Sequence, residues 1–217
     1  MLISLDKTNF PLIVVEEAGV EAHLLPVTKT QFGRFMEETR GIAAGAYQAM
    51  LKLNPPAAPE QFLIEEREQL FITGILPDEA LAFARWLGEG YDLPTVKEWR
   101  AIYAALRREP PPRHTLLTDV VEGPAKPIFQ KFTDKLYLRS MRDLSLMEGG
   151  LVEWTRKGRE WVGLGVPRPE FHPNLWDVLT HEIKPIRRDR RVPYFGFRLV
   201  RRGDYYLANQ EKARYVF

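Results

Sequence analysis

Amphipathic spacing in the first half of the chain predicts a helix within residues 27–41. Apolar residues there recur three and four positions apart, which places them on one face of an α-helix. Thr28 followed three residues later by Gln31 has the pattern of a capping box, in which each side chain bonds the other residue's backbone N–H at the helix start. Gly41 is expected to end the helix, since glycine readily adopts the left-handed conformation of a C-terminal cap.

Two more helices are predicted in residues 76–90 and 93–108. Pro77 suits the first position of the former, because the missing proline N–H would have no helical partner there. The latter begins with Thr95 and Glu98, a second capping box. The apolar residues that follow in both segments recur at helical spacing and form one buried stripe.

The second half of the chain has a different pattern. Short apolar runs separated by glycine, proline and charged residues predict short strands and turns. These runs are residues 135–141, 150–156, 160–166, 195–201 and 204–208. One brief helix is predicted within residues 173–183, capped by Asn174. We therefore expect an α+β fold, with helices in the first half and an irregular antiparallel β region in the second.

Composition places the chain among globular proteins. Its 217 residues are 45% hydrophobic and 12% aromatic, which is enough for a sizeable core. Proline-rich stretches at residues 54–60 and 109–113 are expected to form surface loops and not flexible linkers. We therefore predict a single domain over residues 1–217. No apolar run approaches the roughly 20 residues of a membrane span. Residues 1–19 lack the basic region of a signal peptide, so a cytoplasmic location is expected.

The small net charge of +2 conceals a basic segment at residues 184–202. This segment contains eight lysine and arginine residues and one aspartate, so its own charge is +7. Such a cluster suits phosphate, nucleic acid or an acidic protein surface. Alternatively, the basic side chains pair with acidic residues elsewhere in the fold, and few aromatic residues accompany them to stack on bases. The sequence leaves both possibilities open.

Cysteine is absent from the chain. Disulfides, thiolate metal sites, iron–sulfur clusters and thiol nucleophiles are therefore excluded. The four histidines are scattered along the sequence. Asp177 and His181 are spaced to share one helix face, but two ligands without a third donor make an incomplete metal site.

Four segments in a fixed order resemble the formylglycine-generating enzyme, or sulfatase-modifying factor, superfamily. They are PVTKTQFGRFM, GILPDEALAFARWLGEGYDLPTVKEWRAIYAA, DLSLMEGGLVEWT and YFGFRLVR, at residues 26–36, 74–105, 143–155 and 194–201. The L-P-T element followed by E-W, and the final G-F-R, carry much of this likeness. The resemblance covers about residues 20–202 and leaves residues 203–217 as a C-terminal extension.

This resemblance implies a C-type lectin-like fold of the sulfatase-modifying-factor type. Trp86, Trp99, Trp154 and Phe197 are expected to be core aromatics. Arg198, within G-F-R, is expected to be half-buried with its guanidinium paired to a carboxylate. These matching positions identify a fold and not an activity.

Catalytic members of the family hold their metal with a pair of cysteines between a G-G-S turn and the final G-F-R. In this chain the corresponding stretch is residues 161–198, where no cysteine occurs and the turn has become G-L-G. Formylglycine generation by that route is therefore excluded. A calcium site of the family uses the asparagine and glutamate of G-N-V-W-E-W, which correspond here to Gly150 and Glu153. Glu153 is thus a calcium candidate without the asparagine oxygen, and no other cofactor is expected.

These observations lead us to expect a non-catalytic binding or adaptor module that recognises a protein partner through the loop region replacing the catalytic site. Its candidate contact residues mix arginine and aromatic side chains, as interface hot spots do. They are Arg168, Phe171, His172, Trp176, Arg187, Arg188, Arg190 and Arg191. Cysteine-free members of the family resemble the variable proteins of diversity-generating retroelements and modules encoded near bacterial signalling or defence genes. The alternatives are a metal-dependent oxidoreductase with oxygen and nitrogen ligands, and nucleic-acid binding through residues 184–202.

Overall fold

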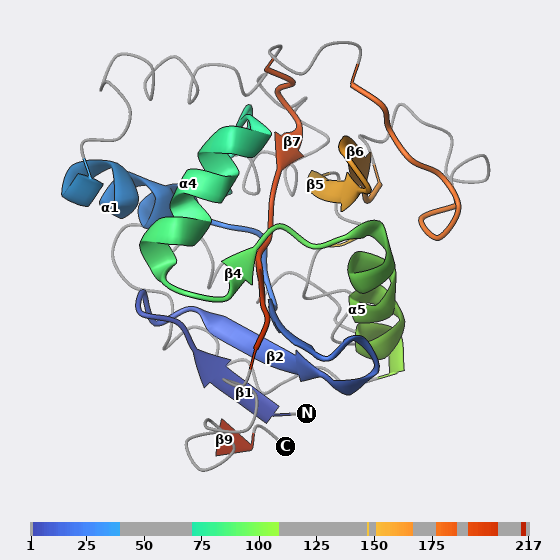
Figure 1. Cartoon of the computed structure of the whole chain (residues 1–217), viewed down its shortest axis with the longest axis horizontal. Helices are drawn as coiled ribbons and strands as arrows, with labels where there is room; N and C mark the ends of the chain where they lie inside the picture. Colours follow the sequence, from blue (N-terminus) through green and yellow to red (C-terminus); the bar gives the residue numbers. More distant parts are fainter. Residues whose placement is uncertain are drawn as a thin grey trace, which may run out of the picture.

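The computed structural model describes residues 2–39, 71–108, 147, 151–166, 177–185, 191–203 and 214–215. Within these residues, a six-stranded and a three-stranded sheet pack with three α-helices (Figure 1). The helices are α1 (Lys29–Thr39), α4 (Pro77–Leu87) and α5 (Val96–Arg108). The predicted α+β class is confirmed. None of the described helices is both long and apolar enough to cross a membrane.

The six-stranded sheet brings the two ends of the chain together. Its strand order is β4-β8-β3-β2-β1-β9, and every neighbouring pair is antiparallel. The strands are β1 (Leu2–Leu5), β2 (Pro11–Val15), β3 (Val20–His23), β4 (Tyr91–Asp92), β8 (Val200–Arg201) and β9 (Arg214–Tyr215). Because β9 pairs with β1, the first and last strands lie at the same edge of the sheet (Figure 1).

Strands β1, β2 and β3 precede every α-helix, and the sequence pattern did not predict them. The expected order of helices first and strands second therefore holds only loosely. The physical reason is clearest in β3, which is buried at every position, including the polar residues Glu21 and His23. A strand of this kind lacks the alternation of apolar and polar residues by which a half-buried strand is identified.

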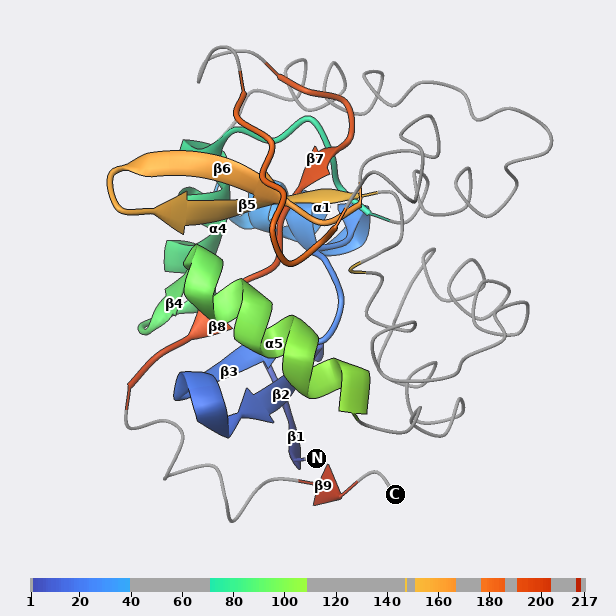
Figure 2. The same ribbon diagram turned by 90° about the vertical axis from the view of Figure 1, so that its right-hand side faces the viewer.

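The three-stranded sheet is built on β5 (Val152–Lys157). It pairs antiparallel with β6 (Glu160–Leu164) and parallel with β7 (Phe195–Gly196), so the expected antiparallel region contains one parallel pair. A Cβ atom at Gly163 of β6 would lie 2.3 Å from Val152 Cγ1 and 2.5 Å from the Phe195 ring, so close packing requires glycine there. The β5–β6 hairpin runs alongside α5 (Figure 2).

Both predicted capping boxes are present. Gln31 N–H donates to Thr28 Oγ1 (3.1 Å), and Thr28 N–H donates to Gln31 Oε1 (3.0 Å), at the start of α1. At the start of α5, Glu98 N–H donates to Thr95 Oγ1 (3.2 Å), and Thr95 N–H donates to Glu98 Oε2 (2.7 Å). Each pair satisfies two backbone donors that the helix itself leaves without partners. The predicted stop at Gly41 lies outside the described residues.

The brief helix predicted within residues 173–183 is wrong for its described part, 177–183, which forms a turn followed by an isolated bridge at Ile183. The Asp177 carboxylate accepts hydrogen bonds from Leu179 N–H (2.9 Å) and the Thr180 hydroxyl (2.9 Å). Aspartate side chains that bond the backbone two residues further on favour turns over helix continuation. The expected cap at Asn174, and the runs 135–141 and 204–208, lie outside the described residues.

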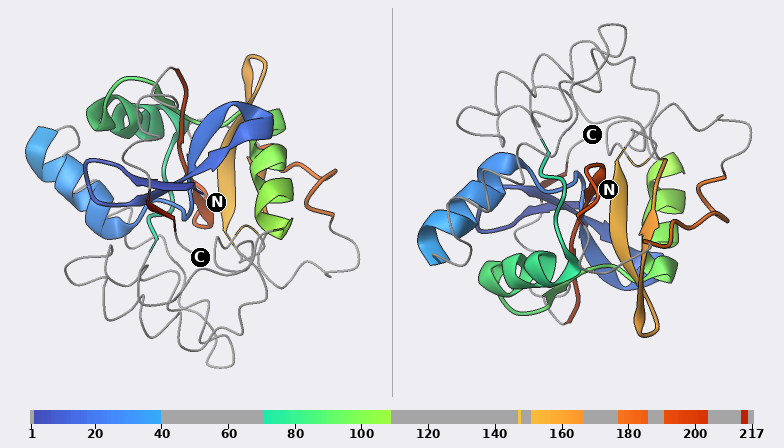
Figure 3. Two further views of the ribbon diagram at one scale, coloured as in Figure 1. Left: turned by 90° about the horizontal axis from the view of Figure 1, so that it is seen from below. Right: turned by 90° about the horizontal axis from the view of Figure 1, so that it is seen from above.

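The core has two apolar clusters. One joins strands β2, β3 and β8 to α5 and contains Trp99. The other joins α1 and α4 to the three-stranded sheet and contains stacked and edge-to-face rings, with Phe83 5.7 Å from Phe32 and 5.6 Å from Phe197 between ring centroids. Trp99, Trp154 and Phe197 are fully buried, as predicted. Helices α1 and α5 lie on opposite sides of the described structure (Figure 3).

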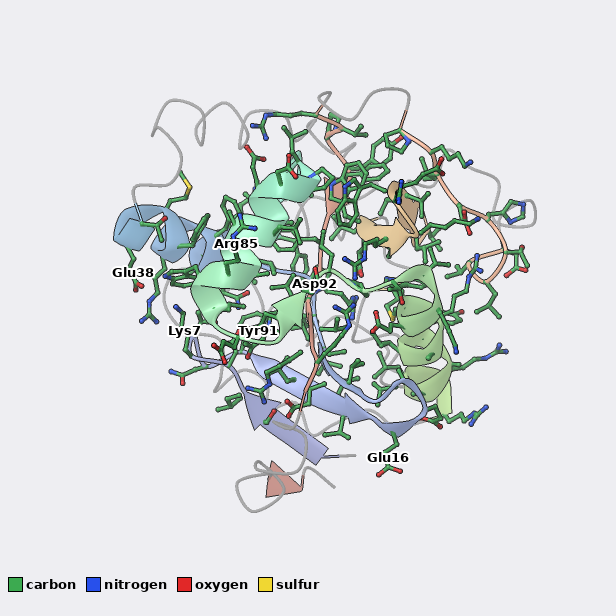
Figure 4. The ribbon with its side chains drawn as sticks, viewed as in Figure 1. Lys7, Glu16, Glu38, Arg85, Tyr91 and Asp92 are labelled. Carbon is green, nitrogen blue, oxygen red and sulfur yellow. The ribbon has the colours of Figure 1, made fainter. Side chains whose placement is uncertain are left out.

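Trp86, the fourth predicted core aromatic, is half-buried at the surface of α4. Its indole N–H donates to Glu38 of α1 (2.9 Å). The Lys7 ammonium, from the turn between β1 and β2, lies 3.8 Å from the centroid of the indole ring and bonds the Trp86 carbonyl oxygen. Lys7 and Glu38, which are both labelled in Figure 4, thus contact the Trp86 side chain from two different parts of the fold.

The turn between β1 and β2 is organised by the buried carboxylate of Asp6. Its Oδ1 atom accepts hydrogen bonds from the backbone N–H groups of Thr8 (2.7 Å) and Phe10 (3.0 Å), and its Oδ2 atom lies 3.0 Å from His23 Nε2 in β3. Gln31 Nε2 donates to Thr8 Oγ1 (2.9 Å), which extends the network to α1. Burial opposes ionisation of Asp6, but the bonds from His23, Thr8 and Phe10 outweigh it and hold the Asp6 pKa below its ordinary value.

Replacing Asp6 with asparagine should lower the free energy of unfolding by about 2–4 kcal/mol at pH 7, because His23 and the turn lose a buried anionic acceptor. The lowered pKa of Asp6 means that the carboxylate stabilises the fold above the ordinary value of 3.8 and loses this effect as the pH falls through the lower folded value. The difference between wild type and Asp6→Asn should therefore be largest near neutral pH and shrink in acid. Urea unfolding at pH 7 and pH 3 measures both.

Asp78→Asn is the matched control, since this carboxyl is exposed in the first turn of α4. It should change the unfolding free energy by no more than about 0.5–1 kcal/mol. A stability difference between wild type and Asp6→Asn that stays constant from pH 7 to pH 3 would contradict the assigned role of the buried carboxylate.

Candidate functional site

The segment in which the sequence resemblance places the family's catalytic loop, residues 161–198, is described at 161–166, 177–185 and 191–198. Of the eight predicted contact residues, Arg191 alone lies within these parts. The other seven lie outside the described residues: Arg168, Phe171, His172, Trp176, Arg187, Arg188 and Arg190. We call the described parts of this segment, which join it to the rest of the fold, its stems. The geometry given below is that of the stems.

The stem at 177–185 is held to the scaffold by backbone and side-chain bonds. Gly163 and Ile183 exchange two backbone hydrogen bonds, of 2.8 and 2.9 Å. The neighbouring Glu182 accepts from Lys157 Nζ (2.8 Å) at the end of β5 and from Arg100 (3.3 Å) of α5. Two elements of the scaffold thus fix the position of this stem.

Asp177 and His181 interact within this stem, in a turn and not on a helix face. Asp177 N–H donates to His181 Nδ1 (2.9 Å), and the Asp177 carboxylate is bonded to Leu179 and Thr180. The backbone bond from Leu179, followed by that from the Thr180 hydroxyl, lowers the pKa of Asp177. Within the described ranges, no three histidine, aspartate or glutamate side chains are grouped as metal ligands.

The stem at 191–198 begins with an ion pair to α4. The Arg191 guanidinium donates to both carboxylate oxygens of Glu79, at 2.6 and 2.7 Å, and to the carbonyl oxygen of Gly74 at 2.8 Å. The predicted contact residue Arg191 is therefore bound to its own chain, with about a quarter of its side chain exposed (26%). Sequence analysis missed Glu79 as its partner, and because the two are 112 positions apart no local signal identifies the pair.

The same stem ends in a fully buried ion pair between Arg198 and Glu153 of β5. Arg198 Nε and Nη2 donate to the two oxygens of Glu153 at 2.5 and 2.6 Å, and the Trp99 indole N–H donates to Glu153 at 2.8 Å. Arg198 Nη1 donates to the carbonyl oxygens of His23 (3.2 Å) and Leu24 (2.9 Å). The predicted pairing of Arg198 is confirmed, whereas its burial is complete and not partial.

These bonds also define the surroundings of the calcium candidate, Glu153. Both of its oxygens are within hydrogen-bond distance of the Arg198 guanidinium, and one also accepts from Trp99. Calcium takes about six to eight oxygen ligands, and a cation at this carboxylate would compete with the guanidinium for the same oxygens. The Glu153 charge is thus balanced by a cation of the chain itself. Gly150 lies outside the described residues.

The described part of the basic segment 184–202 is balanced by acidic residues of other elements. Each of its five described basic residues forms an ion pair: Lys184 with Glu160, Arg191 with Glu79, Arg198 with Glu153, Arg201 with Glu21, and Arg202 with Asp92 and Glu98. The alternative of pairing elsewhere in the fold therefore accounts for these five. Arg187, Arg188 and Arg190 lie outside the described residues.

Arg202 joins the capping box of α5 to β4. Its guanidinium donates to both oxygens of Glu98 (2.7 Å each) and to Asp92 (2.6 Å), which is labelled near the centre of Figure 4. Burial opposes ionisation of Glu98, but the hydrogen bonds from Arg202 and Thr95 outweigh it and hold the Glu98 pKa below its ordinary value.

A family model, the sulfatase-modifying factor enzyme 1-like domain, matches residues 6–115. This match spans β2 to α5 and more than half of the chain, and so the chain belongs to this family, as the four sequence segments indicated. Family membership implies the C-type lectin-like fold, with which the mixed helix and strand content agrees. No curated protein matches the chain. The Arg198–Glu153 ion pair and the stems lie beyond the matched residues.

Removing the charge of Glu153 should severely destabilise the protein. Glu153→Gln leaves Arg198 buried without its counterion, and breaking such a pair costs about 3–5 kcal/mol. Urea unfolding of the purified variant measures this loss. Glu160→Gln is the matched control, because this carboxylate is 61% exposed and lies 3.7 Å from Lys184, so its loss should cost no more than about 1 kcal/mol. Equal effects of the two substitutions would contradict the structural role of the buried pair.

Proposed function

We propose that this chain is a non-catalytic binding or adaptor module that recognises a protein partner through the segment that replaces the family's catalytic loop. The observation that carries the proposal is that both stems are fixed to the scaffold, while the sequence that they bracket is rich in arginine and aromatic residues. The stems are fixed by a backbone bridge at Ile183 and by the ion pairs of Glu182 and Arg191. Loops positioned by a rigid scaffold are where binding residues concentrate.

The residues between the stems have the composition of a protein-binding surface. Residues 167–176 contain Arg168, Phe171, His172 and Trp176, and residues 186–190 contain three arginines. Tryptophan and arginine are among the residue types most enriched in interface hot spots. The chain offers no cysteine for the thiolate chemistry of catalytic relatives. Binding is therefore the function that these residues support best.

Nucleic-acid binding through residues 184–202 is the second candidate, and the ion pairs weigh against it. Five of the eight basic residues have carboxylate partners within the chain. Arg187, Arg188 and Arg190, with Asp189 among them, then carry a net charge of +2. Affinity for nucleic acid comes mainly from neutralising many phosphates, so a charge this small favours a protein partner. A metal-dependent oxidoreductase is the third candidate, and elemental analysis of the purified protein tests it.

The proposal is tested with two matched arginine pairs. Arg187→Ala/Arg188→Ala removes two candidate contacts, and Arg107→Ala/Arg108→Ala removes two exposed arginines at the end of α5. Affinity capture from an extract of the source organism, followed by titration of the recovered protein, should show that the first double variant binds about tenfold or more weakly. The second should bind like wild type.

Two results would contradict the proposal. One is the recovery of no specific protein by the wild-type chain. The other is a nucleic-acid gel shift that weakens steeply as salt rises, since this dependence is typical of phosphate neutralisation and would support the second candidate.

A further inference from the structure

Arg191 occupies a position where the stem meets the N-terminal end of α4. Its guanidinium forms three hydrogen bonds of 2.6 to 2.8 Å, two to the Glu79 carboxylate and one to the Gly74 carbonyl oxygen. The planar fork of arginine fits a carboxylate with two parallel bonds, which fixes orientation as well as distance. We call this arrangement of Arg191, Glu79 and Gly74 the Arg191 clamp.

The acceptors of the Arg191 clamp are themselves held in place. Glu79 Oε2 also accepts the backbone N–H of Leu76 (2.9 Å), so this carboxylate caps α4 while it binds Arg191. Gly74 has a positive φ of 68°, a conformation that glycine adopts without steric cost, and this sets the direction of its backbone. The clamp therefore holds Arg191 against a rigid surface.

The chain after Arg191 is fixed by further bonds. Phe195 N–H donates to the Val192 carbonyl (3.0 Å), and Val152 N–H of β5 donates to the Tyr194 carbonyl (3.0 Å). Residues 192–196 therefore have backbone bonds of their own, which include their pairing with β5. The Arg191 clamp fixes the residue before these, Arg191, which directly follows residues 186–190.

We infer that Arg191 is a positioning residue, which holds the stem of the partner-binding segment on α4 through the Arg191 clamp and does not itself contact the partner. This inference rests on the proposed function for what the segment binds. It removes Arg191 from the candidate contact residues of the segment. Glu79, 112 residues away in sequence, becomes part of the site because it fixes where the segment begins.

Limited trypsin digestion tests the clamp without any partner. Glu79→Gln leaves every trypsin site in place but removes the charge that holds Arg191. Cleavage after Arg191, followed by mass spectrometry, should become about five- to tenfold faster, since proteolysis reports how often a local segment opens. Cleavage elsewhere should be unchanged, and the melting temperature should fall by no more than about 4 °C.

Two further variants make the test specific. Asp78→Asn removes one negative charge from the adjacent exposed position of α4 and should cleave like wild type. Arg191→Lys keeps the positive charge without the planar guanidinium fork and should retain only part of the wild-type protection from trypsin. Wild-type protection by lysine, an unchanged rate in Glu79→Gln, or faster cleavage at all sites together with a large fall in melting temperature would each overturn the inference.

The two proposals fail separately. If Glu79→Gln shows local release while the wild-type chain captures no partner, the positioning role stands and the proposed binding function is wrong. If a partner is captured, loss of affinity in Arg191→Ala together with wild-type affinity in Glu79→Gln makes Arg191 a contact residue and overturns the inference.

Discussion

The buried ion pair between Arg198 and Glu153 is the contact on which the arrangement of the two sheets depends. Taking two charges out of water is expensive, and only good geometry with further hydrogen bonds offsets that cost. Here the guanidinium donates to two carboxylate oxygens and two carbonyl oxygens, and the Trp99 indole N–H donates a further hydrogen bond to Glu153. The backbone of 197–199 pairs with the chain around β3 on either side of the arginine, with Phe197 and Leu199 accepting from Val27 and His23. A different packing of β5, α5 and β3 would leave one of these charges buried and unpaired.

Other basic residues of the segment 184–202 also form ion pairs within the fold. Arg191, Arg198 and Arg201 reach three different elements, α4, β5 and β3, and Arg202 reaches both β4 and α5. What the composition presents as an excess of positive charge is largely a set of intramolecular contacts. These pairs are partly or fully buried and are therefore less screened by salt than surface pairs. Fewer basic residues of this segment are without an intramolecular counterion than its sequence alone suggests.

Local signals in the sequence predicted the helices, because a capping box involves residues three positions apart. Thr28 with Gln31 and Thr95 with Glu98 form in the structure as the spacing indicates. The partner of a buried charged residue, in contrast, lies far away in the sequence. Glu21, a polar residue in β3, is buried because it meets Arg201, which is 180 residues away. The spacing of apolar residues carries no trace of that pairing.

The misassigned helix has a comparable explanation. The candidate cap at Asn174 suggested a helix, but the short Asp177 side chain bonds the backbone N–H of Leu179. A local sequence pattern does not show the outcome of this competition between a side chain and the helical backbone. Arg191 was predicted as a contact residue from its residue type and its place in the segment, and neither distinguishes an arginine that faces a partner from one that is bound to its own fold.

The distribution of these contacts explains how one scaffold accommodates different sites. The bonds at Ile183, Glu182 and Arg191 lie on the stems and are directed toward the sheet and helices. These bonds are formed by the stems themselves, and their partners lie in β5, β6, α4 and α5. The family resemblance implies that catalytic members place two thiolates in the corresponding stretch, whereas this chain places aromatic and basic side chains there. The bonds that fix the stems involve Ile183, Glu182 and Arg191, and a change of chemistry in the stretch that the stems bracket does not require a change in these three residues.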